Sequence, residues 1–270
     1  MTPIDDLRAH LTALGRVVLG YSGGVDSALL AVAATEALGP ARFRAVIGRS
    51  ASYPAAQYAQ AVALAERFGV PLLEVDTGEL ADQRYRANTP DRCYFCKSEL
   101  WDVLHRVREE LGFDVVVDGT NADDLGEHRP GLRAAGERAV RAPLAELGWT
   151  KAQVRAAAQA LGVPQWDAPA APCLASRVRY GVEVTEERLA QVEEAEAYLR
   201  ALGVTGDLRV RHLGDGARIE SRPEMHPLLT AHWDEVVARL QGAGFGRVEL
   251  DPRGYRRGSL LVLDAGGAAR

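Results

Sequence analysis

The fold of this 270-residue chain is decided by the stretch Val17-Val18-Leu19-Gly20-Tyr21-Ser22-Gly23-Gly24-Val25-Asp26-Ser27. Its apolar beginning is typical of a buried strand, and the residues from Ala28 onward favour a helix. A glycine-rich turn that joins a strand to a helix exposes backbone N–H groups beside the positive end of the helix dipole. We therefore predict a phosphate-binding loop, formed by Ser22, Gly23, Gly24, Val25, Asp26 and Ser27.

The residue types of this loop suit a pyrophosphate. Its glycines let the backbone approach a ligand closely, and Ser22 and Ser27 add hydroxyl donors. Each hydrogen bond to a charged group contributes about 1.5–3 kcal/mol, so several of them hold a pyrophosphate well. Asp26 would repel phosphates unless a cation lies between them, so we interpret it as a residue that binds Mg²⁺ or braces the loop. The plainer interpretation is a tight turn with an Asp or Ser helix cap.

The first half of the chain alternates short apolar runs with amphipathic helical patterns. This alternation predicts an α/β fold with a parallel sheet, in which ligands bind at the carboxyl ends of the strands. The expected strands are 16–21, 43–47, 72–75 and 115–118, and the expected helices are 28–37, 55–68 and 97–111.

The pattern changes after Pro143. A proline- and alanine-rich stretch at 164–172 cannot form a regular helix or a central strand. We therefore expect two domains, 1–165 around the phosphate loop and a smaller α/β domain at 166–270, with a site loop at 166–181. Further expected helices are 150–161, 185–202 and 226–241, and further expected strands are 207–212, 218–221 and 247–250.

Composition restricts the function classes. The net charge is −5 and the isoelectric point is near 5.8, which argues against a nucleic-acid partner because such binding needs many basic residues. No apolar run approaches the roughly 20 residues that span a bilayer, so we expect no membrane partner. The first residues also lack the pattern of a secretory signal. We therefore expect a cytoplasmic protein with reduced cysteines.

The three cysteines lie in two motifs. Cys93 and Cys96 form a Cys-x-x-Cys at the start of a helix, and Cys173 follows the proline-rich stretch. Three thiolates suit a [4Fe–4S] cluster with one open iron, or a zinc ion with a fourth ligand elsewhere. A thioredoxin-like dithiol is a third interpretation. Burial as small hydrophobic residues explains one such cysteine better than it explains all three.

Arginines gather around the second cysteine motif and the strand that follows it. Arg209 and Arg211 lie two apart on an expected strand, so they project from the same face. Guanidinium groups suit carboxylates and phosphates, and we predict an anion site here, although solvated surface is the plainer interpretation for any one arginine. Glu220 orients these arginines, helps bind a metal or forms a strand-end salt bridge. The predicted substrate-binding residues are Arg177, Arg179, Arg209, Arg211, Arg218 and Glu220.

The string Ser-Gly-Gly-Val-Asp-Ser resembles the loop of the ATP-pyrophosphatase (PP-loop) superfamily, whose domain is of the HUP-like, adenine nucleotide alpha hydrolase type. That superfamily includes GMP synthetase, NAD synthetase and tRNA thiolation enzymes. The resemblance implies cleavage of ATP between its α- and β-phosphates, with release of pyrophosphate. It also implies adenine contacts at the end of the second strand, at Val46 and Gly48. The superfamily-like segment 118–124 would bring Thr120 and Asn121 to the nucleotide and Asp124 to Mg²⁺; alone, it is typical of a turn that ends a strand.

Nearly the whole chain resembles the LarE family, the ATP-dependent sulfur transferases that help build the nickel-pincer nucleotide of lactate racemase. The motifs that carry the resemblance are Leu147-Gly-Trp-Thr-Lys-Ala-Gln-Val-Arg155, Pro164-Gln-Trp-Asp167, Pro172-Cys-Leu-Ala-Ser-Arg177, Arg209-Val-Arg211, Ala217-Arg-Ile-Glu220 and Gly254-Tyr-Arg-Arg-Gly-Ser259. The resemblance implies a small anionic nucleotide substrate, pyridinium-3,5-biscarboxylate mononucleotide. It also implies homo-oligomers, a sulfide donor system, and catalytic roles for Cys173, Asp26 and Arg211.

In sacrificial members of this family, the cysteine at the position of Cys173 gives up its own sulfur and becomes dehydroalanine. This chain departs from that pattern because it also carries Cys93 and Cys96. Three-cysteine members are similar to the cluster-bearing tRNA thiolation enzymes, which implies that the three thiolates hold a [4Fe–4S] cluster that delivers sulfide. We favour this repeatable transfer. The alternatives are sacrifice of Cys173, a tRNA thiolase of the same superfamily, and an ATP- or metal-sensing binding protein.

Overall fold

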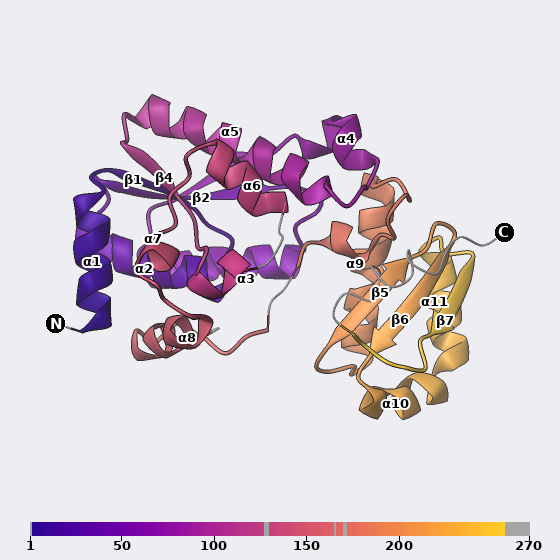
Figure 1. Ribbon diagram of the computed structural model, residues 1–270. Coiled ribbons are helices and arrows are strands. Elements are labelled where there is room, and N and C mark those ends of the chain that lie inside the picture. The colour runs from indigo at the N-terminus through magenta and orange to yellow at the C-terminus, as the bar shows by residue number, and fades with distance from the viewer. Residues whose placement is uncertain (1, 127–129, 165, 170–171, 257–270) are drawn as a thin grey trace. The chain divides into compact units, whose positions relative to one another are not determined.

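The computed structural model describes residues 2–126, 130–164, 166–169 and 172–256. The chain forms two compact units (Figure 1): residues 1–79 and 93–171 make the first, and residues 80–92 and 172–270 make the second. None of the described helices is long and apolar enough to cross a membrane.

A parallel sheet forms the centre of the first unit. In the described residues it has four strands in the order β3-β2-β1-β4. Val17 in β1 pairs with Phe43 in β2 on one side and with Val115 in β4 on the other. The strand order reverses between β1 and β4, and in such sheets ligands bind at the carboxyl ends of the strands beside this reversal. The strands are β1 (Val17–Gly20), β2 (Phe43–Arg49), β3 (Leu72–Asp76) and β4 (Val115–Val117).

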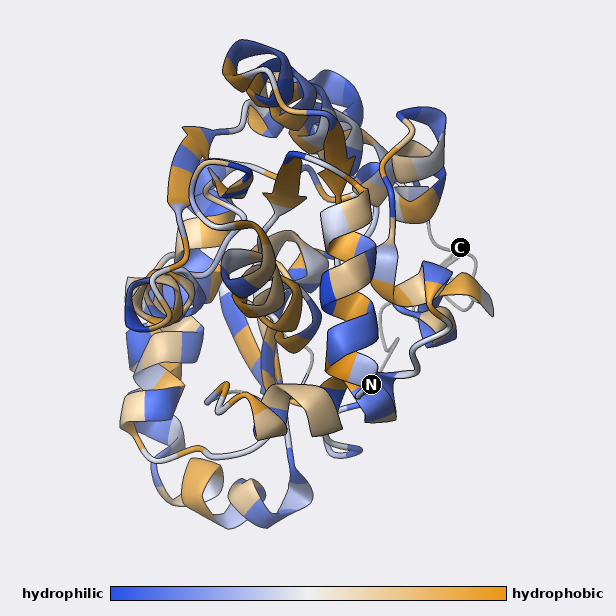
Figure 2. Ribbon diagram, turned by 90° about the vertical axis from the view of Figure 1, so that its left-hand side faces the viewer, coloured by the Kyte–Doolittle hydropathy of each residue, from blue (hydrophilic) through white to orange (hydrophobic). Residues whose placement is uncertain are grey.

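Helices cover both faces of this sheet (Figure 1), because alternate strand residues point to opposite sides. Val17 and Leu19 belong to one buried apolar cluster, and Val18 belongs to the other. The central strand β1 and its neighbour β4 are apolar, β2 and β3 also carry charged residues towards their ends, and the helices show apolar and polar bands (Figure 2). The first cluster is formed with α1 (Pro3–Ala13), α2 (Val25–Leu38), α3 (Ala55–Arg67) and α8 (Lys151–Ala160), and the second with α5 (Arg92–Leu111) and α6 (Pro130–Glu137).

The second unit contains a smaller, mixed sheet. Among the described residues, β6 lies between β5, to which it is antiparallel, and β7, to which it is parallel. Helix α9 packs on β5, and α11 packs on β7 and on α9. The elements are α4 (Gln83–Arg86), α9 (Glu186–Ala201), β5 (Leu208–His212), β6 (Gly216–Ser221), α10 (His226–Ala231), α11 (Trp233–Gly242) and β7 (Arg247–Leu250).

The strands and the main helices predicted from the sequence are confirmed. Thr150 caps α8, with Gln153 completing a capping box, and Thr185 caps α9. The single helix predicted at 226–241 is wrong: His232 has φ −110° and ψ 20°, which interrupts the chain between α10 and α11. The described part of the stretch 164–172 contains neither helix nor strand, as predicted. The sequence analysis did not anticipate α1, α4, α6 or the short helix α7 (Pro143–Glu146).

Residues 80–92 belong with the second unit, although the first unit resumes directly after them. The side chain of Asn88 is fully buried and donates to the carbonyls of Val178, Arg179 and Val182. Asn88 and the residues whose carbonyls it binds are about ninety residues apart in the sequence. These contacts join residues 80–92 to the second unit, and the boundary near residue 165 stays a prediction.

His212, at the end of β5, is buried in the second unit. The backbone N–H of Gly214 donates to its Nδ1 atom at 3.2 Å, so Nε2 carries the proton and donates to Gln191 Oε1 at 2.8 Å. The ring also packs against Phe245, with 5.1 Å between ring centroids. Burial lowers the pKa of His212 to about 4, and the charge of Arg188 acts in the same direction.

We predict that His212 makes the second unit sensitive to acid. In the unfolded chain a histidine has a pKa of about 6.5, so below this pH the unfolded chain binds a proton that the folded chain excludes. The free energy of unfolding should therefore fall by about 2 kcal/mol between pH 6.5 and 5 on account of this group. His212→Gln should remove that part of the pH dependence in urea unfolding. Equal pH dependence in both proteins would contradict the assignment.

Candidate functional site

The phosphate loop joins β1 to α2, as the sequence predicts. Gly24 is the N-cap residue of α2 and has extended backbone angles, and no side chain caps the first N–H groups of the helix. An α-helix leaves its first four N–H groups without partners inside the helix. These groups, together with the positive end of the helix dipole, form an anion-binding surface.

Two features of the structure require glycine at position 23. Its φ of +66° lies in the left-handed region, which disfavours residues with a Cβ atom. A Cβ atom at this position would also lie 2.4 Å from Cβ of Ala61 in α3. The loop therefore packs directly against α3, and Tyr53 Oη fixes it further by donating to the carbonyl of Ser22 at 2.7 Å.

The two loop serines contact each other. Ser22 Oγ and Ser27 Oγ are 3.2 Å apart, and Ser27 Oγ also donates to the carbonyl of Gly24 at 3.0 Å. Ser27 is buried whereas Ser22 is exposed. Ser27 therefore holds the loop in shape, and Ser22 presents its hydroxyl to the surface.

Asp26 lies at the meeting point of three segments. Asn121 Nδ2 donates to Asp26 Oδ1 at 3.1 Å, and Lys151 Nζ, at the start of α8, forms an ion pair with Asp26 Oδ2 at 2.5 Å. The backbone of Gly119 packs against the first turn of α2, because a Cβ atom at Gly119 would lie 3.0 Å from the backbone nitrogen of Ser27. The loop after β4 and the start of α8 thus surround the N-terminus of α2.

The segment after β4 is held by its own carboxylates. Asp118 accepts hydrogen bonds from the backbone N–H and the hydroxyl of Thr120, at 2.9 and 3.0 Å. Burial raises the pKa of Asp118, against the effect of these two hydrogen bonds. Asp124 Oδ2 accepts from the backbone N–H of Asn121 at 3.1 Å. Of the predicted residues, Asn121 therefore contacts the phosphate loop, while Thr120 is bonded to Asp118.

The end of β2 also borders the carboxyl edge of the sheet. The side chain of Val46 is buried in the core, and its carbonyl accepts from the N–H of Tyr21 at 2.8 Å. Gly48 packs against Thr77, since a Cβ atom there would lie 3.0 Å from Thr77 Cγ2. Any contact of Val46 or Gly48 with adenine stays a prediction.

The cysteines lie in different units. Cys93 and Cys96 are in the first turns of α5, one turn apart, and Cys173 is the N-cap residue of the 3-10 helix Leu174–Arg177 in the second unit. None of the three forms a disulfide; Cys93 is exposed, and the other two are partly buried. Across the described ranges, no group of three or more His, Cys, Asp or Glu side chains is gathered as a metal site.

Four charged side chains share one face of the second sheet. The strand register pairs Arg209 with Glu220 and Arg211 with Arg218, and paired residues of antiparallel strands lie on the same face. Arg211 and Glu220 form a buried ion pair at 2.9 Å, and Arg218 forms an ion pair with Glu249. The prediction that Arg209 and Arg211 project together is confirmed.

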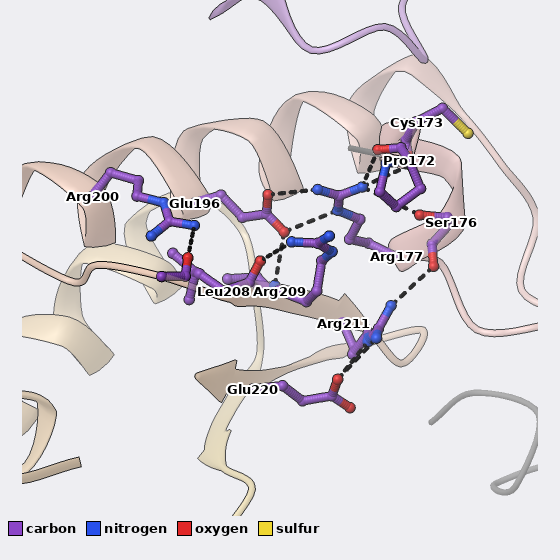
Figure 3. A network of polar contacts seen from close by, with 12 residues as sticks. Pro172, Cys173, Ser176, Arg177, Glu196, Arg200, Leu208, Arg209, Arg211 and Glu220 are labelled. Carbon is purple, nitrogen blue, oxygen red and sulfur yellow. Dashed lines mark hydrogen bonds and ion pairs between the residues drawn. The ribbon is translucent and has the colours of Figure 1, made fainter. Parts of the chain in front are cut away.

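Arg177 and Arg209 are both buried but have different partners (Figure 3). The guanidinium of Arg177 forms a two-point ion pair with Glu196, at 3.0 and 3.1 Å. Arg209 donates to the carbonyl of Leu208 at 2.6 Å and lies 5.2 Å from the centre of the Tyr255 ring. Within the described residues no carboxylate forms an ion pair with Arg209. Burial, followed by the charge of Arg177, lowers the pKa of Arg209. Arg179, by contrast, has an exposed side chain.

Comparisons with known proteins agree with this geometry. The profile of the NAD synthase family matches residues 6–102, which include the phosphate loop. The fold and the loop therefore define an ATP-dependent enzyme of the PP-loop class.

Relatives along the whole length narrow this class to one family. A pyridinium-3,5-bisthiocarboxylic acid mononucleotide synthase of Lactiplantibacillus plantarum is 36% identical over 254 residues, which cover 94% of this chain and 92% of that protein. The chain therefore belongs to the LarE family. Two uncharacterized proteins are also similar. One, from Synechocystis sp., is 44% identical over 95% of this chain and 96% of its own; the other, from Methanocaldococcus jannaschii, is 30% identical over 89% and 91%.

The sequence analysis gave no role to Lys151 or to Gly119. Lys151 is the first residue of α8, where the helix dipole disfavours a positive charge. A lysine directly after the capping residue Thr150 was therefore a usable signal, because such a residue needs a compensating partner. The structure supplies Asp26 as that partner.

We predict that Gly23→Ala destabilises the chain more than the control Gly39→Ala. Gly39 also has a left-handed φ, of +68°, but a Cβ atom added there would have no other atom within 4 Å. Its ψ of 175° places Gly39 in a conformation that is almost confined to glycine, so Gly39→Ala should cost about 1–3 kcal/mol from the backbone alone. Gly23→Ala should cost about 1–3 kcal/mol more, because of the collision with Ala61. Urea unfolding measures both losses.

A second substitution tests whether the collision with Ala61 causes the loss of stability. Ala61→Gly in the Gly23→Ala background removes the colliding methyl group and should restore part of the lost stability, despite the cost of about 1 kcal/mol for glycine in a helix. Equal losses in Gly23→Ala and Gly39→Ala would contradict the close approach of the loop to α3.

Proposed function

We propose that this enzyme is an ATP-dependent sulfur transferase. It adenylates a carboxylate of pyridinium-3,5-biscarboxylic acid mononucleotide, releases pyrophosphate, and replaces the activated carboxylate by a thiocarboxylate. The observation that carries the proposal is the uncapped N-terminus of α2 with Asp26, Asn121 and Lys151 around it. The name of the Lactiplantibacillus plantarum relative supports the choice of substrate.

The first step uses the phosphate loop. The N–H groups at the start of α2 and the hydroxyl of Ser22 bind the β- and γ-phosphates, and the Lys151 ammonium offsets their charge. A substrate carboxylate oxygen then attacks the α-phosphorus, and the bond from this phosphorus to the pyrophosphate oxygen breaks. Mg²⁺, held by the carboxylates of Asp26 and Asp124, would neutralise the leaving pyrophosphate; carboxylate oxygens are suitable ligands for it.

The second step replaces AMP by sulfur. A free carboxylate is a poor electrophile, whereas an acyl-adenylate has AMP as a good leaving group. Sulfide attacks the acyl carbon, the bond to AMP breaks, and a thiocarboxylate remains. Adenylation before sulfur transfer therefore explains why one chain combines an ATP loop with a thiol-bearing loop.

The anionic substrate binds at the face of the second sheet that carries Arg209, Arg211 and Arg218. A mononucleotide with two carboxylates carries at least three anionic groups, and guanidinium groups match them. Arg209 is the best placed of the predicted residues, because it is buried without a carboxylate partner among the described residues. In this proposal Arg211, fixed by Glu220, contacts the reacting carboxylate. The supporting residues are Arg177, Arg179 and Arg218.

For sulfur delivery, we favour a [4Fe–4S] cluster bound by Cys93, Cys96 and Cys173. The donor chemistry fits, since these are thiols that form no disulfide and two of them lie one helical turn apart. When bound, the cluster would supply an open iron that carries an extra sulfide. Cys173 then acts as a ligand and keeps its sulfur. The alternative is the sacrifice of Cys173 itself. Homo-oligomers, a sulfide donor system and a cytoplasmic location complete the proposal.

We predict that the protein purified without oxygen is brown and contains about four irons and a similar amount of sulfide per chain. Cys93→Ala and Cys96→Ala should each lose the colour and most of the iron. Absorbance with iron and sulfide analysis tests this. A colourless wild-type protein that cannot be reconstituted would contradict the cluster. Mass spectrometry after turnover should in that case find Cys173 lighter by one H₂S.

A further inference from the structure

The segment that carries Cys173 is almost without regular structure. We call residues 172–184 the cysteine loop; within it, only the short 3-10 helix Leu174–Arg177 is regular. Backbone carbonyls in such a segment have no ladder of hydrogen bonds to join, and a buried carbonyl without a partner is costly. In the cysteine loop, side chains bind most of these carbonyls.

Two arginines hold the beginning of the loop (Figure 3). Arg177 donates to the carbonyl of Pro172 and, at 3.0 Å, to the carbonyl of Cys173. Arg211 donates to the carbonyl of Ser176 at 3.1 Å. The sulfur atom of Cys173 points away from the Arg177 guanidinium (Figure 3). These arginines therefore fix the backbone around the cysteine, while its thiol is directed away from the Arg177 guanidinium and is partly buried.

The rest of the loop is held from outside, by residues 86–92, which we call the bracing segment. The two hydrogens of Asn88 Nδ2 are donated to the carbonyls of Arg179 and Val182, both at 2.8 Å, and the carbonyl of Val178, at 3.3 Å, shares one of them. Arg92 Nη1 donates to the carbonyl of Ala175 at 2.7 Å. Both residues belong to the second unit, as the cysteine loop does.

Asn88 and Arg92 also hold each other. Arg92 Nη1 donates to Asn88 Oδ1 at 2.6 Å, which fixes the amide so that its NH₂ group faces the loop carbonyls. Asn88 is fully buried, Arg92 is 4% exposed, and the Arg92 guanidinium lies 5.8 Å from the centre of the Tyr180 ring. An apolar side chain in place of this buried amide would remove its hydrogen bonds to the loop, and of the three carbonyls that of Arg179 would keep the hydrogen bond from the Val182 N–H.

The backbone of the bracing segment adds two contacts. The N–H of Gly181 donates to the carbonyl of Asn88 at 3.1 Å, and the N–H of Val184 donates to the carbonyl of Arg86 at 2.9 Å. Asn88 has a φ of +52°, a conformation that asparagine tolerates better than most residues. Both the backbone and the side chain of Asn88 are thus shaped to hold the cysteine loop.

We propose that Asn88 and Arg92 are positioning residues for Cys173. They hold the cysteine loop in one conformation, so that the thiol of Cys173 is presented in a single orientation for sulfur transfer. The inference rests on the proposed function in one respect, the use of Cys173 in sulfur transfer. It adds a determinant that lies about eighty residues before the cysteine in the sequence, directly ahead of Cys93.

The test uses the ligand-free 270-residue chain and measures, by peptide mass spectrometry, the rate at which iodoacetamide alkylates Cys173. Asn88→Gly keeps the left-handed backbone and removes only the side-chain hydrogen bonds. Arg92→Met keeps most of the side-chain volume and removes the donor. The control is Arg200→Met, because Arg200 is an exposed arginine of the second unit that donates to the carbonyls of Val204 and Gly206, outside the loop.

Loosening the loop should expose the partly buried thiol, so Asn88→Gly and Arg92→Met should each raise the Cys173 alkylation rate about tenfold. Arg200→Met should leave it unchanged, and the alkylation rate of Cys96 should be the same in all four proteins. In the ATP-dependent transfer assay, kcat should fall about tenfold in the two variants with an unchanged KM for ATP, because the phosphate loop is intact.

Alkylation rates within about twofold of wild type in both variants would overturn the proposal, whatever happens to turnover. An equal rise in Arg200→Met would also overturn it, since the effect would then be general loosening of the unit. Failure of the proposed function has a different signature. Cys173→Ala with full sulfur-transfer activity would remove Cys173 from the chemistry, and it would leave the alkylation rates of the other variants as they are.

Discussion

The arrangement of segments around the phosphate loop is fixed by the ion pair between Asp26 and Lys151. This ion pair joins the phosphate loop to the start of α8, and Asn121 binds the other oxygen of the same carboxylate. The close approach of Gly119 and the direct packing of Gly23 on Ala61 require that these positions lack side chains. The N-terminus of α2 is therefore enclosed by three segments that are far apart in the sequence, and its N–H groups stay available to an anion.

In the second unit, the dominant constraint is that buried polar groups need hydrogen-bond partners. Buried carbonyls need hydrogen-bond donors and buried guanidinium groups need acceptors, and here the guanidinium groups donate to the carbonyls. Arg177, Arg211 and Arg92 each bind carbonyls of the cysteine loop, while carboxylates hold Arg177 and Arg211 in place. Arg209 is the exception, because no described carboxylate forms an ion pair with it. That difference is the reason for which we propose Arg209 as the substrate-binding arginine.

The sequence predicted local features well and long-range ones poorly. The strands, the phosphate loop and the caps at Thr150 and Thr185 follow from periodicity and residue type, and the structure contains them. The break at His232 was missed because apolar periodicity continues across it. The assignment of residues 80–92 to the second unit depends on Asn88 and Arg92, whose partners are more than eighty residues away. Periodicity does not contain that information, and neither does it identify Asp26 as the partner of Lys151.

The central claim is that ATP is cleaved at its α-phosphate in order to activate a carboxylate. The most direct measurement is product analysis after incubation with ATP, Mg²⁺ and pyridinium-3,5-biscarboxylic acid mononucleotide, with the Asp26→Ala variant as the inactive control. The account predicts AMP and pyrophosphate in equal amounts, formed only when the mononucleotide is present and absent with the variant. Release of ADP and phosphate, or cleavage that is unaffected by either the mononucleotide or the substitution, would contradict it.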